Sequence, residues 1–322
     1  MEEFEIINKY FKKISLNSPA ASKLDNDVAN FSIENDQQLI ISKDIMVENI
    51  HFGSNYTADQ IAHKLLASNL SDLASAGAKP HSYMLGFSKN NNIDKNFITS
   101  FCSKLETLSK EYNISLIGGD TVSSNSDLFF SITILGTCPK NKILSRSKAR
   151  DKDLIFISGN IGDSYMGLQI LQNKINITDN TTKNYFLNRH HYPTARVSLG
   201  IKILNRDLSR TAIDISDGLF ADLNHICQNS KLSANIFLDK IPISSHCHNL
   251  QIDKMKLFSG GEDYELIFTA KENKREEIAL LSQELDLNIT EIGFLSKDND
   301  RKIKLFDQNN NKIEIKKYGY EH

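Results

Sequence analysis

Apolar residues recur at helical spacing at the start of the chain, and strand-like patterns alternate with further helical ones after it. Phe4, Ile7, Phe11 and Ile14 share one helical face and predict an amphipathic helix over residues 3–14. Other helical patterns lie at 61–76, which Pro80 would end, at 94–112, with Asp94 as N-cap and an aromatic-rich core stripe, and at 166–171, 219–227 and 272–284. The turn at 159–164 could make an anion-friendly start for the helix at 166–171, and the spacing of Cys227 indicates a core position. Strand patterns lie at 39–44, 114–117, 128–136, 154–158, 211–213, in the residues that follow 263, and at 288–295, and the asparagines at 309–311 predict the turn of a C-terminal hairpin. This mixture predicts an α/β (α+β) protein.

The pattern restarts near residue 150, where a polar turn at 151–153 precedes the strand at 154–158. With 322 residues the chain is long enough for two ordinary domains, although one domain of this length is possible. We therefore predict domains at 1–150 and 151–322, with a boundary accurate to about ten residues.

Composition removes several classes of function. The formal net charge is −2, from 38 basic and 40 acidic residues, so nothing in the overall charge favours nucleic acid or an acidic membrane as partner. The four cysteines include no C-x-x-C pair, which disfavours a zinc knuckle or a disulfide framework. No secretion signal or membrane-length apolar run is evident, and we expect a cytoplasmic protein.

Candidate chemistry begins where the strand at 211–213 runs into a polar corner. Asp214, Ser216 and Asp217 supply oxygen atoms, and Gly218 would let the backbone approach a bulky anion before the next helix starts. Taken alone, such a corner is more often a capped turn than a site. Its interpretation depends on whether carboxylates recur at other corners.

They recur in the first half of the chain. Strand alternation places Ser42 and Asp44 on one face and Lys43 on the other. Asn69 and Asp72 lie on the apolar stripe of a predicted helix, where a carboxylate is costly unless it is paired or binds a metal. From the sequence alone, Asp72 is equally consistent with a metal ligand and with an ordinary surface residue.

Two glycine pairs precede acids at further corners. Gly118 and Gly119 lead into Asp120, and the segment 260–263 reads Gly-Gly-Glu-Asp. Neither a Rossmann nor a P-loop motif is present. Oxygen ligands without clustered His or Cys favour magnesium or manganese over zinc. Glycine-containing turns beside such ligands suggest a site for ATP, with its phosphates bridged by the metal ions.

The segments 69–80, 118–121, 214–219 and 260–266, together with His51-Phe52, occur in an order and spacing that resemble the thiamine-monophosphate kinase family. The resemblance places the chain in the superfamily that includes aminoimidazole ribonucleotide synthetase and selenophosphate synthetase. It implies an ATP-dependent kinase that converts thiamine monophosphate to thiamine diphosphate with several magnesium ions and no protein nucleophile. It further implies a homodimer whose N-terminal mixed sheets form a shared barrel, with residues 151–322 completing the active site.

The same resemblance assigns roles to individual residues. The implied magnesium ligands are Asp27, Ser42, Lys43, Asp44, Asp72, Asp120, Asp214 and Asp217. The implied nucleotide contacts are Gly119, Asp120, Arg146 and Ser216. The implied substrate contacts are His51, Glu262 and Tyr320. Without the family match, a core or capping role for the histidine and a loose terminal position for the tyrosine would be the simpler readings.

Three positions depart from the family pattern. Asn26 and Lys43 stand where the family has Asp and Thr, and Lys148 stands where it has Gly. If position 43 contributes its carbonyl, alternation sends the ammonium group away from the metal. Two alternatives remain: a non-catalytic nucleotide and metal-binding homologue, or another ATP-dependent enzyme of the superfamily. Selenophosphate synthetase would need a reactive cysteine near the N-terminus, whereas the first cysteine is Cys102.

Overall fold

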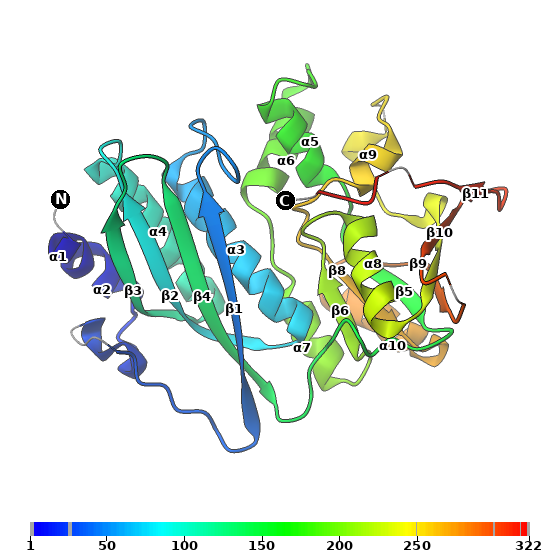
Figure 1. Cartoon of the computed structure of the whole chain (residues 1–322), viewed down its shortest axis with the longest axis horizontal. Coiled ribbons are helices and arrows are strands. Elements are labelled where there is room, and N and C mark those ends of the chain that lie inside the picture. Colours follow the sequence, from blue (N-terminus) through cyan, green and yellow to red (C-terminus); the bar gives the residue numbers. More distant parts are fainter. Residues whose placement is uncertain (1–2, 25–27, 249, 299, 316, 321–322) are drawn as a thin grey trace. The chain divides into compact units, whose positions relative to one another are not determined.

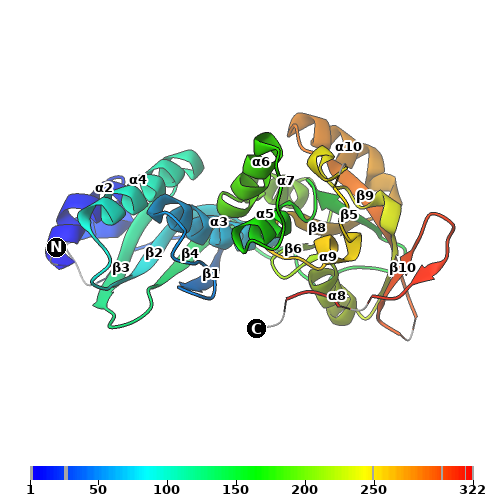
Figure 2. The ribbon, with the colours of Figure 1, turned by 90° about the horizontal axis from the view of Figure 1, so that it is seen from above.

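The computed structural model describes residues 3–24, 28–248, 250–298, 300–315 and 317–320 (Figures 1 and 2). The chain forms two compact units. Unit 1 comprises Met1–Leu73 and Ala78–Asn141, and unit 2 comprises Ala74–Gly77 and Lys142–His322. Each unit has its own sheet, so the mixed α/β class predicted from the sequence is confirmed.

Unit 1 is built on a four-stranded sheet in the order β1-β4-β2-β3. Its strands are β1 (Gln37–Val47), β2 (Lys79–Lys89), β3 (Ser115–Ser123) and β4 (Phe129–Pro139). The β1–β4 and β2–β4 pairs are antiparallel and the β2–β3 pair is parallel. One cross-strand row contains Asp44, Ile132, Leu85 and Gly119, and the next row contains Ile45, Ser131, Gly86 and Asp120.

Two long helices, α3 (Ala58–Ala76) and α4 (Lys95–Tyr112), cover one face of this sheet (Figures 1 and 2). The Asp94 side chain caps α4 by accepting a hydrogen bond from the Phe97 amide, as the sequence predicts. Before the sheet, the predicted N-terminal helix is present as α1 (Glu3–Ile6) and α2 (Lys12–Ile14) joined by a π-helical stretch, Ile7–Phe11. A 3₁₀ segment, Pro19–Leu24, follows.

Aromatic rings fill the space between α4 and the sheet. The ring centroids of Phe87 and Phe101 are 5.4 Å apart, and those of Phe101 and Phe130 are 5.1 Å apart. All three side chains are fully buried. The aromatic stripe predicted from the sequence is therefore core, and each ring adds packing energy beyond its buried area.

The opposite face of this sheet carries exposed apolar side chains. Ile41 and Ile45 on β1 are 58% and 52% exposed, and Met84, Val122 and Phe129 on the other strands are each more than a third exposed. These apolar side chains share the face with Lys43 and Asp120, and exposed apolar groups gathered on one face of a sheet are typical of a protein interface.

Unit 2 contains a seven-stranded mixed sheet in the order β11-β10-β7-β9-β5-β8-β6. Its strands are β5 (Leu154–Ser158), β6 (Thr211–Asp214), β7 (Ser233–Phe237), β8 (Leu266–Ala270), β9 (Ile289–Ser296), β10 (Ile303–Phe306) and β11 (Lys312–Ile313). Strands β10 and β11 form the predicted C-terminal hairpin. The last four strands in this order, β9, β5, β8 and β6, bring the start of β9, the end of β5, the start of β8 and the end of β6 to the same end of the sheet.

Helices of unit 2 complete its core. They are α5 (Asp163–Leu171), α6 (Asn180–His191), α7 (Val197–Asn205), α8 (Leu219–Ser230), α9 (Lys254–Phe258) and α10 (Arg275–Glu284), with 3₁₀ turns at Leu238–Lys240, Ser245–Cys247 and Glu272–Lys274. Cys227 on α8 is buried in this core, as its spacing predicts. Within the described residues, no helix combines the length and the apolar character needed to cross a membrane.

Candidate active site

In unit 1, polar side chains from β1 and α3 meet at the helix-covered face of the sheet. The Ser42 hydroxyl donates a hydrogen bond to Asp72 Oδ2, and the Asp44 amide donates to Asn69 Oδ1 at 3.2 Å. Asn69 and Asp72 are three residues apart on the same stripe of α3, so one helical turn presents both to the strand. The convergence that the sequence suggested for these residues is present.

Asp44 is half-buried among groups that affect its ionisation. Burial raises the pKa of its carboxyl, while a hydrogen bond from Ser68 and the charge of His51 act in the opposite direction. His51 itself is fixed by its own turn, because its Nδ1 accepts a hydrogen bond from the Val47 amide at 3.0 Å.

Lys43 points to the other face of the sheet. Its Nζ lies 3.3 Å from Ser131 Oγ and 3.4 Å from Thr133 Oγ1, both on β4. Ser42 and Asp44 engage α3 instead. The ammonium group is therefore directed away from the carboxylates. On the helix-covered face of the sheet, Lys43 contributes only the main-chain atoms that join Ser42 to Asp44.

The Gly119–Asp120 pair is divided between the two faces. A Cβ on Gly119 would lie 2.0 Å from the Leu85 carbonyl oxygen, so close strand packing alone requires this glycine. Asp120 belongs to the row of Ile45 and Gly86, and its carboxylate accepts a hydrogen bond from the Thr121 amide at 2.9 Å. Within unit 1, Asp120 thus does not join the cluster around Asp44.

In unit 2, the strand β6 ends at the polar corner predicted from the sequence. Asp214 is buried at the strand end, and Ser216 and Asp217 are half-buried in the turn that precedes α8. Gly218 adopts φ of +124°, and a Cβ there would lie 2.9 Å from main-chain atoms of Ser259. This glycine is needed for both the backbone conformation and the close approach of a neighbouring segment.

Asp222, in the first turn of α8, organises this corner and was not identified from the sequence. Its Oδ2 accepts hydrogen bonds from the amides of Ser216, Asp217 and Gly218 at 3.0, 3.1 and 3.2 Å. Burial, followed by the nearby Asp214 and Asp217 carboxylates, raises the pKa of its carboxyl to about 8. Three acids thus share one small, largely buried region.

The glycine-rich segment 260–262 packs directly on this corner. The Glu262 amide donates to the Ser216 carbonyl oxygen at 2.8 Å, and a Cβ on Gly261 would lie only 2.1 Å from that oxygen. The Tyr320 amide donates to the Asp217 carbonyl oxygen at 2.9 Å. Three segments far apart in the sequence therefore bring the predicted Ser216, Asp217, Glu262 and Tyr320 together.

Glu262 is presented in a strained conformation beside a buried histidine. Its φ is +67°, a region that few non-glycine residues occupy. His190 on α6 is fully buried, and its Nδ1 lies 3.6 Å from Glu262 Oε2 and 3.0 Å from Ser164 Oγ. The side chain of Glu262 is thus oriented by His190, a residue that no motif in the sequence indicates.

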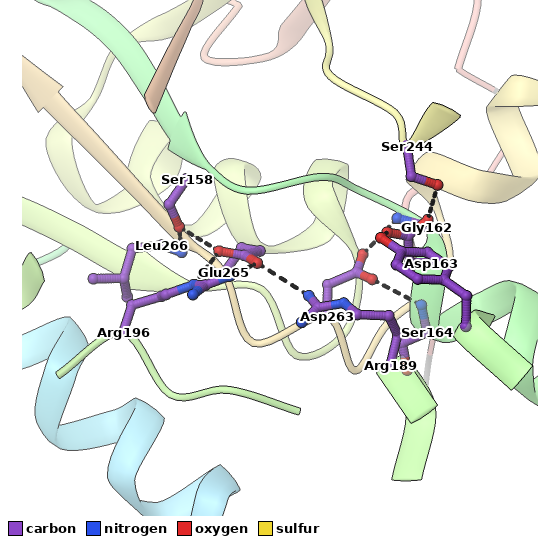
Figure 3. A network of polar contacts seen from close by, with 11 residues as sticks. Ser158, Gly162, Asp163, Ser164, Arg189, Arg196, Ser244, Asp263, Glu265 and Leu266 are labelled. Carbon is purple, nitrogen blue, oxygen red and sulfur yellow. Dashed lines mark hydrogen bonds and ion pairs between the residues drawn. The ribbon is translucent and has the colours of Figure 1, made fainter. Parts of the chain in front are cut away.

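The next acid of the same segment has a structural role. Asp263 is buried and accepts hydrogen bonds from the amides of Gly162 and Ser164 at 2.8 and 3.1 Å (Figure 3). The start of α5, which the sequence suggested as an anion site, is therefore filled by this carboxylate. Burial raises the Asp263 pKa to about 8, against the effect of these two amides.

Glu265 lies at the centre of a buried ion network (Figure 3). Arg196 binds it with two nitrogens, Arg189 donates at 3.1 Å, and Ser158 donates at 2.6 Å. Burial acts to raise the Glu265 pKa, but Arg196, followed by Arg189, outweighs it and lowers the pKa. The two arginines line a cavity of about 560 Å³ at the edge of the sheet.

The donor atoms fit oxygen-ligated divalent cations. Within the described residues, no three His, Cys, Asp or Glu side chains lie close enough to hold a metal by themselves. The carboxylates instead occur with hydroxyl, amide and carbonyl oxygens, as at Ser42, Asn69 and Ser216. This mixture suits magnesium, which keeps several water ligands and shares substrate phosphates, better than zinc.

Comparison with known proteins decides the family. Residues 25–138 match the family model for the AIR synthase related protein, N-terminal domain. A thiamine-monophosphate kinase from Haemophilus influenzae is 39% identical over 299 residues, covering 91% of this chain and 89% of its own length. The chain belongs to the thiamine-monophosphate kinase family.

Solved structures agree with this family. The crystal structure of thiamine-monophosphate kinase from Stenotrophomonas maltophilia K279a is 31% identical, has a TM-score of 0.85, and covers 95% of this chain and 96% of its own. The structure of AaThiL complexed with AMPPCP and TMP is 25% identical, has a TM-score of 0.77, and covers 99% of this chain and 97% of its own.

Within this thiamine-monophosphate kinase family member, the residues expected to act together fall into one group per unit. Unit 1 gathers Ser42, Asp44 and Asp72, with His51 in electrostatic range of Asp44. Unit 2 brings the turn that contains Ser216 and Asp217 into contact with Glu262 and Tyr320. Arg146 is exposed, and its carbonyl oxygen accepts a hydrogen bond from Ser230. Asp27 lies outside the described residues.

Proposed function

We propose that the protein transfers the terminal phosphoryl group of ATP to thiamine monophosphate, forming thiamine diphosphate and ADP. The observation that carries this proposal is the convergence of segments 216–217, 262 and 320 on one corner in a chain of this family. The relative AaThiL was solved with AMPPCP and TMP, an ATP analogue and a phosphate acceptor. This complex, with a protein of the same fold, supports ATP and thiamine monophosphate as the two reactants.

We assign the residues to roles as the family resemblance implies. Magnesium would be held by Asp27, Ser42, the main chain of Lys43, Asp44, Asp72, Asp120, Asp214 and Asp217. ATP would be contacted by Gly119, Asp120, Arg146 and Ser216, and thiamine monophosphate by His51, Glu262 and Tyr320. Residues 1–150 would contribute the dimer face and a share of the ATP and metal contacts, and residues 151–322 the remainder.

The chemistry requires alignment more than proton transfer. The acceptor is a phosphate monoester with a second pKa of about 6, so its attacking oxygen is already ionised at neutral pH. No side chain has to act as nucleophile or general base; the protein holds donor and acceptor in line. Magnesium ions, when bound, neutralise the phosphate charges and the charge that develops during transfer.

Individual side chains then orient the two reactants. Tyr320 is 54% exposed and its amide is anchored on Asp217, so its ring would stack on the cationic thiazolium of the acceptor at this corner. Glu262 adds a carboxylate near the same fixed positive charge. Ser216 offers a hydroxyl donor to a nucleotide phosphate. Its main chain is fixed, because its amide donates to Asp222 and its carbonyl oxygen accepts from the Glu262 amide.

We further propose a homodimer formed through the open face of the sheet in unit 1. Five apolar side chains, Ile41, Ile45, Met84, Val122 and Phe129, are exposed there. Burying them against a second copy would remove a large apolar surface from water. The two sheets would then face each other, in agreement with the barrel that the family resemblance implies.

Turnover with thiamine monophosphate tests the function directly. Phosphorus NMR should show ADP and thiamine diphosphate rising together, with no reaction when magnesium is removed by chelation. Free phosphate without thiamine diphosphate would refute the kinase, and nucleotide binding without turnover would identify a binding module. Asp72→Asn and Asp217→Asn should lose at least about 100-fold in rate with the fold retained, whereas Asp239→Asn, an exposed control, should not.

A further inference from the structure

The corner at the end of β6 has the form of an anion site, but its own chain fills it. The amides of Ser216, Asp217 and Gly218 point at a single point in space, as amides do in phosphate-binding loops. That point is occupied by Asp222 Oδ2. A phosphate group therefore cannot use these three donors while the Asp222 carboxylate is in place.

The position of Asp222 explains how it reaches them. It follows Gly218, the N-cap residue of α8, by one helical turn, and its own amide donates to the Gly218 carbonyl oxygen at 3.0 Å. Its side chain is 2% exposed and turns back over the start of the helix.

The consequence falls on the neighbouring side chains. With the three amides bound to Asp222, the side chains of Ser216 and Asp217 remain half-buried and are not enclosed. The two carbonyl oxygens of the same turn are also held, that of Ser216 by Glu262 and that of Asp217 by Tyr320. The turn is thus fixed through both its donors and its acceptors.

We propose that Asp222 is a positioning residue that holds the 216–218 turn, so that Ser216 presents its hydroxyl to the nucleotide and Asp217 its carboxylate to magnesium. The inference rests on the proposed kinase function and specifies its geometry: the corner acts through side chains, and its backbone amides do not bind phosphate. Asp222 itself touches neither reactant.

Two substitutions at Asp222 distinguish the effect of its hydrogen-bond acceptor from the effect of its charge. Asp222→Asn keeps a carbonyl oxygen that can accept the three hydrogen bonds, whereas Asp222→Ala removes every acceptor. The matched control is Asp179→Ala, which removes a comparable carboxylate bond to a helix amide, Thr182 at 2.8 Å, on an exposed part of α6. The three variants are compared with the full-length wild-type protein.

Amide hydrogen exchange of the peptide covering 214–223 gives the decisive readout, because it does not depend on catalysis. Exchange at 216–218 should rise by about tenfold or more in Asp222→Ala and stay close to wild type in Asp222→Asn and Asp179→Ala. Unchanged exchange in Asp222→Ala would overturn the proposal. Exchange that rises equally throughout unit 2 would also overturn it, since that shows a general structural role.

Steady-state kinetics supply the second readout. Asp222→Ala should raise the KM for magnesium-ATP by about tenfold, with partial rescue in Asp222→Asn. Asp179→Ala should leave KM unchanged. If the wild-type protein shows no kinase activity, the proposed function fails while the exchange experiment still decides the role of Asp222. A tighter binding of inorganic phosphate to Asp222→Ala would support the filled-site geometry, and weaker binding would contradict it.

Discussion

Gly261→Ala offers a direct test of how the corner is assembled. A Cβ at this position would lie 2.1 Å from the Ser216 carbonyl oxygen, whereas real Cβ atoms essentially never approach closer than 3.0 Å. One of the two main chains must therefore move by about 1 Å. That shift also stretches the 2.8 Å hydrogen bond from the Glu262 amide to the same oxygen.

The magnitude follows from these two effects. Forcing a methyl group into a packed site costs about 1–3 kcal/mol, and the weakened hydrogen bond adds about 1 kcal/mol. We expect the free energy of unfolding to fall by about 2–4 kcal/mol, and the KM for both substrates to rise because Ser216 and Glu262 move together. Denaturant unfolding followed by circular dichroism measures the first, and initial-rate kinetics the second.

Gly118→Ala is the matched control. Its Cβ would meet the flexible end of Met84 at 3.3 Å, which can rotate aside. The expected change is within about 1 kcal/mol and can be stabilising, because alanine restricts the unfolded chain. If Gly261→Ala were as stable as Gly118→Ala, the close contact between the two corners would be wrong, and with it the grouping of Glu262 and Ser216.

Three other substitutions test separate features. Glu265→Gln should destabilise the protein at pH 7 by about 3–5 kcal/mol, because Arg189 and Arg196 lose their buried counter-charge. Since the folded pKa of Glu265 lies below its usual value of 4.5, the stability it contributes is present above about pH 4.5 and is lost as pH falls through the folded pKa; pH-dependent unfolding of Glu265→Gln should lack this loss. Lys43→Thr should change the magnesium requirement by no more than about twofold, because the ammonium faces Ser131 on the other side of the sheet; a large drop would place the lysine at the metal. Ile45→Lys should convert dimer to monomer in light scattering, and a wild-type monomer would refute the proposed interface.

Elements with strong periodicity and caps were predictable from the sequence. The helix α4 begins after the Asp94 cap that its pattern indicates, and β5 covers the same residues as the predicted strand at 154–158. In contrast, the sequence does not predict β2, because Pro80 indicates the end of the preceding helix and not a position inside a strand. In the structure, Pro80 lies within β2 at a register irregularity between residues 80 and 82, where a proline is tolerated.

Other elements gave no usable pattern. The helix α6 carries mostly polar residues, and of its large apolar side chains only Phe186 is fully buried. Its position comes from tertiary packing against α5, where Gly167 lets the two helices approach closely: a Cβ there would lie 2.3 Å from the Phe186 carbonyl oxygen. Such packing depends on residues that are distant in sequence, so no local window predicts it.

The acids at the corners could be identified from the sequence, but the division of labour among them could not. Glu262 and Asp263 are neighbours with the same chemistry, yet one carboxylate lies beside His190 near the corner and the other caps α5. The role of each carboxylate is decided by the number of hydrogen bonds that it accepts from backbone amides. Asp222 accepts three and Asp263 two, and a carboxylate committed in this way is held in place and has little capacity left for a ligand.

The same criterion predicts the character of each substitution. Replacing an amide-bound carboxylate by alanine leaves buried donors without partners, so stability or local order should suffer first and activity as a consequence. At Asp217, replacement by asparagine removes a charge from a turn that is already held by Asp222, Glu262 and Tyr320, so activity should fall while the fold persists. The asparagine variants of Asp217 and Asp222 therefore form an opposed pair: the first should lose turnover with an ordered turn, and the second should keep the turn and most of its function.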